Sequence, residues 1–401
     1  MSNFTRSGRP EINGDGLFFL FSGRSWVTNG VTPYRNLIDI KPPVTHEFAA
    51  LIAVISGGDP FLMAFLADFT TSAAVVGIVV LVGQLAYQQA RDPRAAYAAG
   101  TAVLFFPLYY SYPGFRPKYF TVAFGLLSVW LLTREQPAGA GASAAVAAGF
   151  WQFGAIFPVL VLGQTAVRRD WSATIRSLAG IVVVVIVVIL PIALAGILAV
   201  GDMLEQVIFF PIIASEDMPL AVRIDKFVAI LGPAVPAVII GVLGALLPAA
   251  TAIKRRVLNR SRQRADPGLW LSILAGWFIL QVFVFDLDAG IDLLPLLACC
   301  ALGYGALGRV LDEHTILILL SVVTVAVGFG GVSPIQPGPW THEVGSMQWH
   351  YWTATPPSSD CFIKKGFDAY LTGPAREAGL PAGSTCGHDF ERIVRIALGL
   401  Q

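Results

Sequence analysis

Long runs of apolar residues are the feature that most constrains this chain. Ile181–Leu190 contains no polar side chain, and similar stretches recur along the sequence. About 20 apolar residues of helix cross the ~30 Å hydrocarbon core of a bilayer, whereas a transmembrane barrel shows ~10-residue segments of alternating polarity. Only 13% of the 401 residues are charged, which is too few to cover the surface of a water-soluble protein. The sequence therefore predicts an all-α polytopic membrane protein.

The apolar pattern gives candidate spans, and the charge balance excludes one class of partner. The net charge is +1, so the chain lacks the basic surface of a nucleic-acid-binding protein, and no nucleic-acid partner is expected. The candidate spans are residues 61–87, 95–112, 118–133, 142–167, 174–199, 227–251, 268–286, 290–308 and 314–332.

Basic residues in the short loops predict the orientation of these spans. One set of loops holds thirteen Lys and Arg residues, among them Arg91, Arg134 and Arg168, whereas the opposite loops hold four. The richer set is expected to be cytoplasmic. All thirteen stay on one side only if 142–167 forms two short halves, broken within Gly149–Gly154 or at Pro158.

This reading predicts about ten crossings and three regions. Residues 1–60 form an external loop with interfacial helices, 61–332 the transmembrane bundle, and 333–401 a small external C-terminal segment. No signal peptide is visible near Met1. We therefore expect a first transmembrane helix ahead of this chain; the alternative is that the N-terminus is translocated with the helix that follows it.

The N-terminal region combines polar residues with short helices. Leu17–Trp26 is expected to form an interfacial helix, with Phe18, Phe19, Phe21 and Trp26 at the headgroup boundary. Pro42–Pro43 imposes an extended segment. A helix from about His46 to Ser56, capped by Val44 or Thr45 and ended by Gly57–Gly58, is too short to span a membrane.

The sequence of residues 14–47, GDGLFFLFSGRSWVTNGVTPYRNLIDIKPPVTHE, resembles the first external loop of GT-C glycosyltransferases. It is most similar to the archaeal dolichyl-phosphate-mannose mannosyltransferases. The resemblance implies a GT-C-like helix bundle in the cell membrane, with the active site on the non-cytoplasmic face. It also implies transfer of a hexose, expected to be mannose, from a dolichyl-phosphate donor to a lipid-linked glycan in surface-protein N-glycosylation, with inversion in a single displacement.

The same resemblance suggests roles for three residues. Asp15 occupies the position of the general base. Many relatives have Glu at the next position, whereas this chain has Gly16. Any role that an acidic pair would share therefore falls on Asp15 alone or on another carboxylate such as Asp39. Lys41 matches the lysine associated with the lipid phosphate. The alternatives are that Asp15 caps a helix and that Asp39 and Lys41 are a solvated pair.

Five further residues are candidates for substrate binding, and for each of them a structural role is the alternative. Arg35 and His46 lie in the same motif, where Arg35 also suits a headgroup anchor and His46 a helix-start residue. Arg116 and Lys118 follow an aromatic loop on the predicted outer side, where an anchoring belt is the alternative. Gln152 lies at the predicted break, where it would line a cavity or bridge two helices.

The remaining polar groups are expected to be structural. The segment Asp286–Asp292 reads as a polar turn rather than a metal site, and no metal or other cofactor is predicted. Arg223 and Lys226 read as part of a solvated outer loop. Cys361 and Cys386 are expected to form a disulfide outside the cytoplasm. The alternative is a zinc site, but the spacing of the ligands fits no standard pattern. Cys299 and Cys300 lie in an apolar span and read as inert.

Three functions are compatible with a polytopic membrane chain. A lipid or solute transporter, or a flippase, would favour charged residues at the membrane midplane and a second broken span. A scaffold subunit would leave Asp15 and Lys41 without a role. Because the polar residues gather at one predicted face, the sequence favours the transferase. Its expected partners are a dolichyl-phosphate sugar donor, a lipid-linked oligosaccharide acceptor and membrane lipid.

Overall fold

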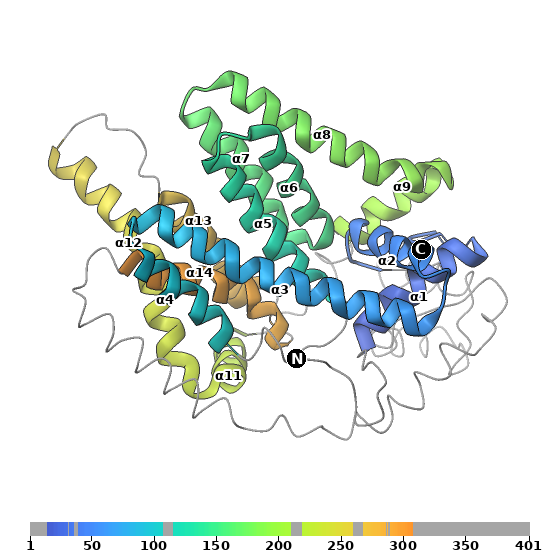
Figure 1. Ribbon diagram of the computed structural model, residues 1–401, viewed down its shortest axis with the longest axis horizontal. Helices are drawn as coiled ribbons and strands as arrows, with labels where there is room; N and C mark the ends of the chain where they lie inside the picture. The colour runs from blue at the N-terminus through green and yellow to red at the C-terminus, as the bar shows by residue number, and fades with distance from the viewer. Residues whose placement is uncertain are drawn as a thin grey trace. The chain divides into compact units, whose positions relative to one another are not determined.

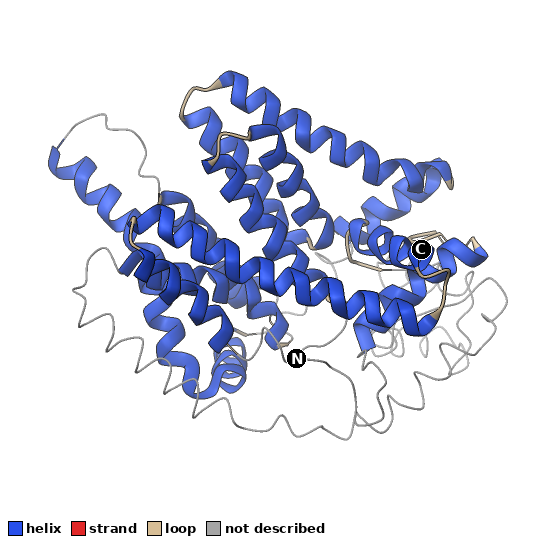
Figure 2. Cartoon of the chain, viewed as in Figure 1, coloured by secondary structure: helices blue, strands red, loops and turns tan. Residues whose placement is uncertain are grey.

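A computed structural model of the chain describes residues 14–30, 32–35, 39–106, 115–209, 219–259, 268–285, 287 and 289–307. Helices make up most of this part, and no strand occurs within it (Figure 2). The predicted all-α architecture is therefore confirmed.

Figure 1 shows the helices of the described residues along the chain. In chain order they are α1 (Gly14–Asn29), α2 (Val44–Ile55), α3 (Pro60–Ala90), α4 (Pro93–Phe105), α5 (Pro117–Thr133), α6 (Pro137–Phe150), α7 (Ile156–Val167), α8 (Trp171–Leu194), α9 (Ile197–Leu204), α11 (Leu220–Leu231), α12 (Val235–Asn259), α13 (Leu269–Leu280) and α14 (Leu294–Leu307).

Three helical stretches are long and apolar enough to cross a membrane. They are Leu62–Ala90 within α3, all of α8, and Gly290–Leu307, while α11 and α12 qualify together as a bent pair. Most of the α8 surface is apolar and exposed, as on Val183, Ile186 and Val187, which suits a lipid environment. The described residues thus contain helices that are long and apolar enough to span a membrane. The total of about ten crossings stays a prediction, and segment 314–332 lies outside the described residues.

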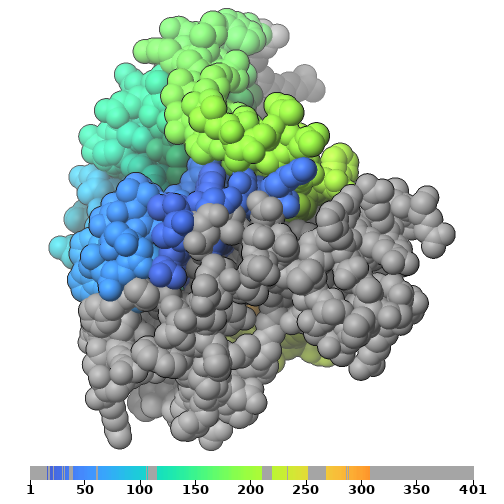
Figure 3. Space-filling view, turned by 90° about the vertical axis from the view of Figure 1, so that its right-hand side faces the viewer, coloured from blue at the N-terminus to red at the C-terminus, as the bar shows by residue number. Residues whose placement is uncertain are grey.

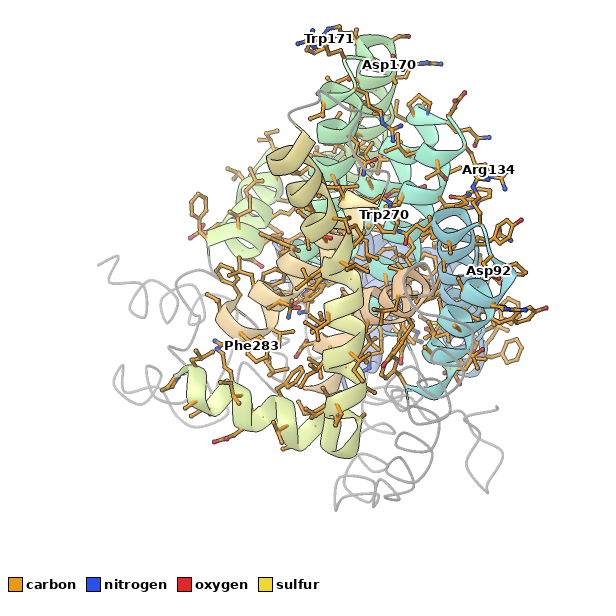
Figure 4. The ribbon with its side chains drawn as sticks, turned by 90° about the vertical axis from the view of Figure 1, so that its left-hand side faces the viewer. Asp92, Arg134, Asp170, Trp171, Trp270 and Phe283 are labelled. Carbon is orange, nitrogen blue, oxygen red and sulfur yellow. The ribbon has the colours of Figure 1, made fainter. Side chains whose placement is uncertain are left out.

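An aspartate precedes the first turn of α4, and another precedes the first turn of α8. The Asp92 carboxylate accepts a hydrogen bond of 2.9 Å from the Arg94 N–H at the start of α4. The Asp170 carboxylate accepts one of 2.9 Å from the Ala173 N–H at the start of α8 (Figure 4). Each carboxylate satisfies a backbone donor that has no partner inside its helix.

The predicted span 142–167 is broken, and the break lies within Gly149–Gly154. Helix α6 ends at Phe150, Trp151 is extended (φ −155°, ψ 136°), and a 3₁₀ turn, η2 (Gln152–Ala155), leads into α7. A Cβ on Gly141 of α6 would meet the Ser177 backbone of α8, close to the end of α7. The two halves therefore run in opposite directions, and Arg134 and Arg168 flank the same end of the pair, as the charge argument required. Pro158 lies inside α7 and is not the break.

The predicted single span 227–251 differs from the structure. Residues 227–231 belong to α11, and α12 begins at Val235, with an angle of 109° between the two helices. Gly232 has φ 50° at the bend, and Pro233 follows it. A glycine in the left-handed region followed by a proline ends a helix, and this signal was overlooked inside an apolar run. The prediction 174–199 also ran past the true end, because α8 stops at Leu194, before Gly196 with φ 141°.

The core of the bundle depends on close contact between α12 and α14. A Cβ on Gly303 would lie 1.9 Å from the Gly241 carbonyl oxygen, and one on Gly244 would lie 2.3 Å from the Gly303 carbonyl oxygen. Small residues let the two backbones meet, which is how helices commonly pair in membranes. Helix α14 is almost completely buried as a result.

The chain divides into two compact units. The first contains α1, α2, the start of α3 as far as Asp68, and residues 186–209 with the end of α8 and α9. The second contains the described residues of 69–185 and 219–307. The candidate residues predicted from the sequence fall into both units.

Candidate functional site

In the first unit, α1 and α2 pack closely together. A Cβ on Gly23 would lie within 2.4 Å of the Ala49 and Ala50 backbone, so only glycine allows this approach. Helix α1 is longer than the predicted Leu17–Trp26. The Phe19 ring is 1% exposed and packs edge-on against His46, with 5.9 Å between ring centres. The prediction that Phe19 anchors at the headgroups is wrong, because α2 covers it.

Helix α2 has nearly the predicted bounds. It begins at Val44 directly after Pro42–Pro43, but no side chain caps it, so the predicted Val44 or Thr45 cap is wrong. It ends where predicted: Gly57 and Gly58 have φ 61° and 76°, and the Gly58 N–H bonds to the Ala53 carbonyl at 2.8 Å.

The centre of this unit is a buried chain of three polar side chains. His46 Nε2 lies 3.3 Å from Asp39 Oδ2, and His46 Nδ1 lies 2.9 Å from Ser22 Oγ. Asp39 is 1% exposed and His46 0%. The imidazole thus links α1 to the segment that precedes α2. The alternative reading of Asp39 and Lys41 as a solvated pair is wrong for Asp39, which the fold shields from water.

Asp39 and Tyr34 together fix the backbone of Lys41. The Lys41 N–H donates to Asp39 Oδ1 at 3.2 Å, and the Tyr34 hydroxyl donates to the Lys41 carbonyl at 2.6 Å. Tyr34 is buried and has φ 67°, which is uncommon for a residue other than glycine. Its burial, and then the negative charges of Asp39 and Glu47, raise the pKa of the Tyr34 phenol, so it remains a donor.

Gln206, which the sequence did not indicate as a site residue, holds the backbone of Tyr34 and Asp39 although it lies far from them in the sequence. Gln206 belongs to the π-helical turn η3 (Glu205–Phe209) that follows α9. Its Oε1 accepts from the Asp39 N–H at 3.2 Å, and its Nε2 donates to the Tyr34 carbonyl at 2.7 Å. Figure 3 shows the α9 segment, in yellow-green, against the blue N-terminal helices. A lone amide in the stretch 203–213, which is apolar except for Glu205 and Gln206, was the available signal, since such a group needs partners when buried.

Arg35 and Glu47 are two further polar side chains of this unit. Arg35 Nη1 lies 3.2 Å from Asp202 Oδ2 of α9, and both side chains are partly exposed. Glu47 is half-buried in α2, and its Oε1 has no hydrogen-bond partner among the described residues. Burial raises the pKa of Glu47 from 4.5 to about 8, so this carboxyl is largely protonated near neutral pH.

Asp15 lies in the first turn of α1. Residues 15, 19 and 22 share one face of a helix because they are separated by four and three positions. Phe19 and Ser22 both contact His46. The backbone of Asp15 is therefore on the side of α1 that meets His46, one turn nearer the helix start.

In the second unit, Lys118 forms a buried ion pair with Asp292, the acid of the 3₁₀ turn η6 (Gly290–Leu293). Its Nζ also lies 4.7 Å from the centre of the Trp151 ring. Asp292 Oδ2 accepts a bond of 2.8 Å from the Ala289 N–H. The pair brings together α5, the break after α6 and the start of α14, and its contacts are those of a structural ion pair.

Two other cations of this unit are also buried. Arg116 is 6% exposed and precedes α5, and Arg223 is 4% exposed. Arg223 Nη2 lies 3.5 Å from the Phe285 carbonyl. The prediction that Arg223 lies in a solvated loop is wrong, because it is part of α11. Gln152 lies in η2 as predicted and is partly buried.

Several predicted features lie outside the described residues. These are the aromatic loop ahead of Phe115, the cysteines Cys361 and Cys386, and the histidines of the C-terminal segment. Cys299 and Cys300 are buried and free, as expected of inert thiols. Within the described part, no cluster of three or more His, Cys, Asp or Glu side chains suits a metal ion.

Comparison with known proteins places the chain in a family. Residues 30–190, which include Asp39, Lys41, His46 and Arg116, match the family model for DolP-mannose mannosyltransferases. The dolichol phosphate-mannose mannosyltransferase of Haloferax volcanii is 30% identical over 322 residues, covering 79% of this chain and 67% of that protein. The chain belongs to this family. The resemblance expected from residues 14–47 is confirmed, and the family decides for a glycosyltransferase over a transporter.

Two solved structures to which the chain is similar have longer chains and are distant in sequence. The oligosaccharyltransferase of Archaeoglobus fulgidus in its apo form is 15% identical, with a TM-score of 0.49 over 98% of this chain. ArnT from Cupriavidus metallidurans is 18% identical, with a TM-score of 0.44 over 97% of this chain. The chain spans 56% and 65% of their respective lengths.

Proposed function

We propose that this chain transfers mannose from dolichyl-phosphate mannose to a lipid-linked glycan during surface-protein N-glycosylation. The reaction would take place at the non-cytoplasmic face of a multi-pass protein in the cell membrane. The observation that carries the proposal is the fixed backbone of Lys41, bonded on one side to Asp39 and on the other to Tyr34. A lysine whose backbone is held beside a short apolar helix suits contact with a lipid phosphate at the membrane surface.

The proposed reaction is a single displacement. The acceptor hydroxyl oxygen forms a bond to the anomeric carbon of mannose, and its proton passes to the Asp15 carboxylate. The bond between that carbon and the phosphate oxygen breaks, and dolichyl phosphate leaves with the electron pair. Lys41 and Arg35, whose side chain is 49% exposed, would stabilise the negative charge on the departing phosphate.

Asp39 and His46 receive a different role from the one that the sequence suggested. A group that is 1% exposed and paired with His46 is poorly placed to take a proton from an acceptor. We propose that Asp39 holds the Lys41 backbone while His46 holds Asp39. Both act through Lys41, and Asp15 alone is the candidate base.

The residues of the second unit contribute less to the proposal. Arg116 and Gln152 stay candidates for contact with the sugar or the phosphate. Lys118 is a weaker candidate, because its ammonium group already pairs with Asp292. An incoming phosphate would have to displace a buried carboxylate, which is costly.

The test uses the full chain in lipid nanodiscs, with dolichyl-phosphate [14C]mannose as donor and membrane lipid extract from a deletion strain as acceptor. Asp15→Asn should lower kcat by at least about a hundredfold, as for loss of a general base, with little change in donor KM. Lys41→Ala should raise the donor KM. Asp225→Asn and Arg168→Ala, at exposed positions, are the matched controls. Near-normal transfer by Asp15→Asn would overturn its role as base, and unchanged donor KM in Lys41→Ala would overturn the phosphate contact.

A further inference from the structure

One side-chain amide bridges the two backbone sites that flank residues 35–38. Gln206 Oε1 accepts from the Asp39 N–H, and Gln206 Nε2 donates to the Tyr34 carbonyl, at 3.2 and 2.7 Å. The glutamine is 167 residues from Asp39 in sequence. The amide therefore closes a link between the π-helical turn η3 and the segment that leads to Lys41.

This link needs both halves of an amide. A carboxylate would only accept and an ammonium would only donate, whereas the amide of Gln206 does each once. A π-helical turn is rare and often occurs at functional sites. Here it places the glutamine side chain beside the two backbone groups that it bridges.

The two residues bridged by Gln206 are also the two that hold Lys41. Asp39 accepts from the Lys41 N–H through its carboxylate, and Tyr34 donates to the Lys41 carbonyl through its hydroxyl. Tyr34 keeps φ 67°, a conformation that persists only where its surroundings determine it. Tyr34 also packs against Ile192, Ala199 and Met203 in an apolar cluster, which has no directional bond to set the position of the backbone groups. Another polar contact between these segments, Arg35 with Asp202, is partly exposed and contributes little to their position.

We propose that Gln206 is a positioning residue that sets where Lys41 meets the donor phosphate. The inference rests on the proposed function, in which Lys41 binds that phosphate. Among the described residues, the hydrogen bonds of the Gln206 side chain go to backbone groups only, so its substitution should act on donor KM far more than on kcat.

The experiment compares Gln206→Glu with Glu205→Gln, an exposed neighbour on the same turn, in the full chain in nanodiscs. Gln206→Glu keeps an acceptor for Asp39 but loses the donor to Tyr34. We expect the donor KM to rise about tenfold, the effect of one or two lost hydrogen bonds, and kcat to change by less than about threefold. Hydrogen–deuterium exchange should be faster at the Asp39 amide in Gln206→Glu and unchanged in Glu205→Gln. Gln206→Asn, whose amide is one methylene short, is the second variant if Gln206→Glu folds poorly.

Two failures are distinguishable. If Lys41→Ala raises the donor KM while both Gln206 variants leave KM and the Asp39 exchange rate as in the parent, the positioning role is wrong. If Lys41→Ala leaves the donor KM unchanged, the proposed function of Lys41 fails. Faster Asp39 exchange in the Gln206 variants would then still support the structural link, but the link would have no phosphate contact to position.

Discussion

Nε2 of His46 lies 3.3 Å from Oδ2 of Asp39, and water reaches neither side chain. Nδ1 of the same ring lies 2.9 Å from Ser22 Oγ of α1. Because buried polar groups without partners are costly, the three side chains depend on one another.

His46→Phe should destabilise the first unit. The ring would still pack against Phe19 and Tyr34, but Asp39 and Ser22 would each lose a partner. We expect the loss of these two contacts to cost about 1–3 kcal/mol each, measured as a lower Tm in detergent. Ser22→Ala, which removes a single neutral hydroxyl, should have a smaller effect. An unchanged Tm in His46→Phe would show that the contact with Asp39 is dispensable.

Glu47 should make the stability depend on pH. Its pKa is raised to about 8 in the folded chain, above the 4.5 of an exposed glutamate. Between these values the folded state holds a proton that the unfolded state has released, so stability falls as the pH rises through this window. Glu47→Gln should flatten the fall and stabilise the chain most above pH 8. Thermal unfolding between pH 5 and 9 tests this, with exposed Glu135→Gln as control; parallel curves for the parent and Glu47→Gln would contradict it.

Lys118 should matter for folding more than for donor binding. Lys118→Met leaves the Asp292 carboxylate, which is 2% exposed, without its cation. Breaking a buried ion pair in this way costs about 3–5 kcal/mol. The double variant Lys118→Met with Asp292→Asn should regain much of the lost Tm. If the double variant is no more stable than Lys118→Met alone, the two side chains are not coupled.

Gly303 should tolerate no side chain. A Cβ there would lie 1.9 Å from the Gly241 carbonyl oxygen and 2.7 Å from the Ala245 nitrogen, and both atoms belong to the α12 backbone. Gly303→Ala should therefore separate α12 from α14 at a cost of about 1–3 kcal/mol or more. Gly276→Ala is the matched control, because no atom lies within 4 Å of its added Cβ. Equal yields and Tm values for the two variants would argue against the close crossing.

Local signals in the sequence predicted several helices and the positions where they end. The uninterrupted apolar run predicted α8, and Pro42–Pro43 and Gly57–Gly58 predicted the bounds of α2. The charge distribution predicted that 142–167 is broken, either within Gly149–Gly154, where the structure has the break, or at Pro158. These features depend on a few neighbouring residues, whose backbone preferences act wherever the segment lies. The same reasoning overlooked the bend at Gly232 because a glycine inside an apolar run does not always end a helix.

The sequence by itself determined the helical class, the two short helices of the motif and the family to which the chain belongs. Only the tertiary structure decided that Asp39 and Phe19 are buried, that His46 joins α1 to the Asp39 segment, and that Gln206 bridges Tyr34 and Asp39 from 167 residues away. The physical reason is that burial and hydrogen-bond partners depend on which helices pack together. Neither the periodicity of apolar residues nor the spacing of polar ones predicts which distant segment supplies the partner of a polar group.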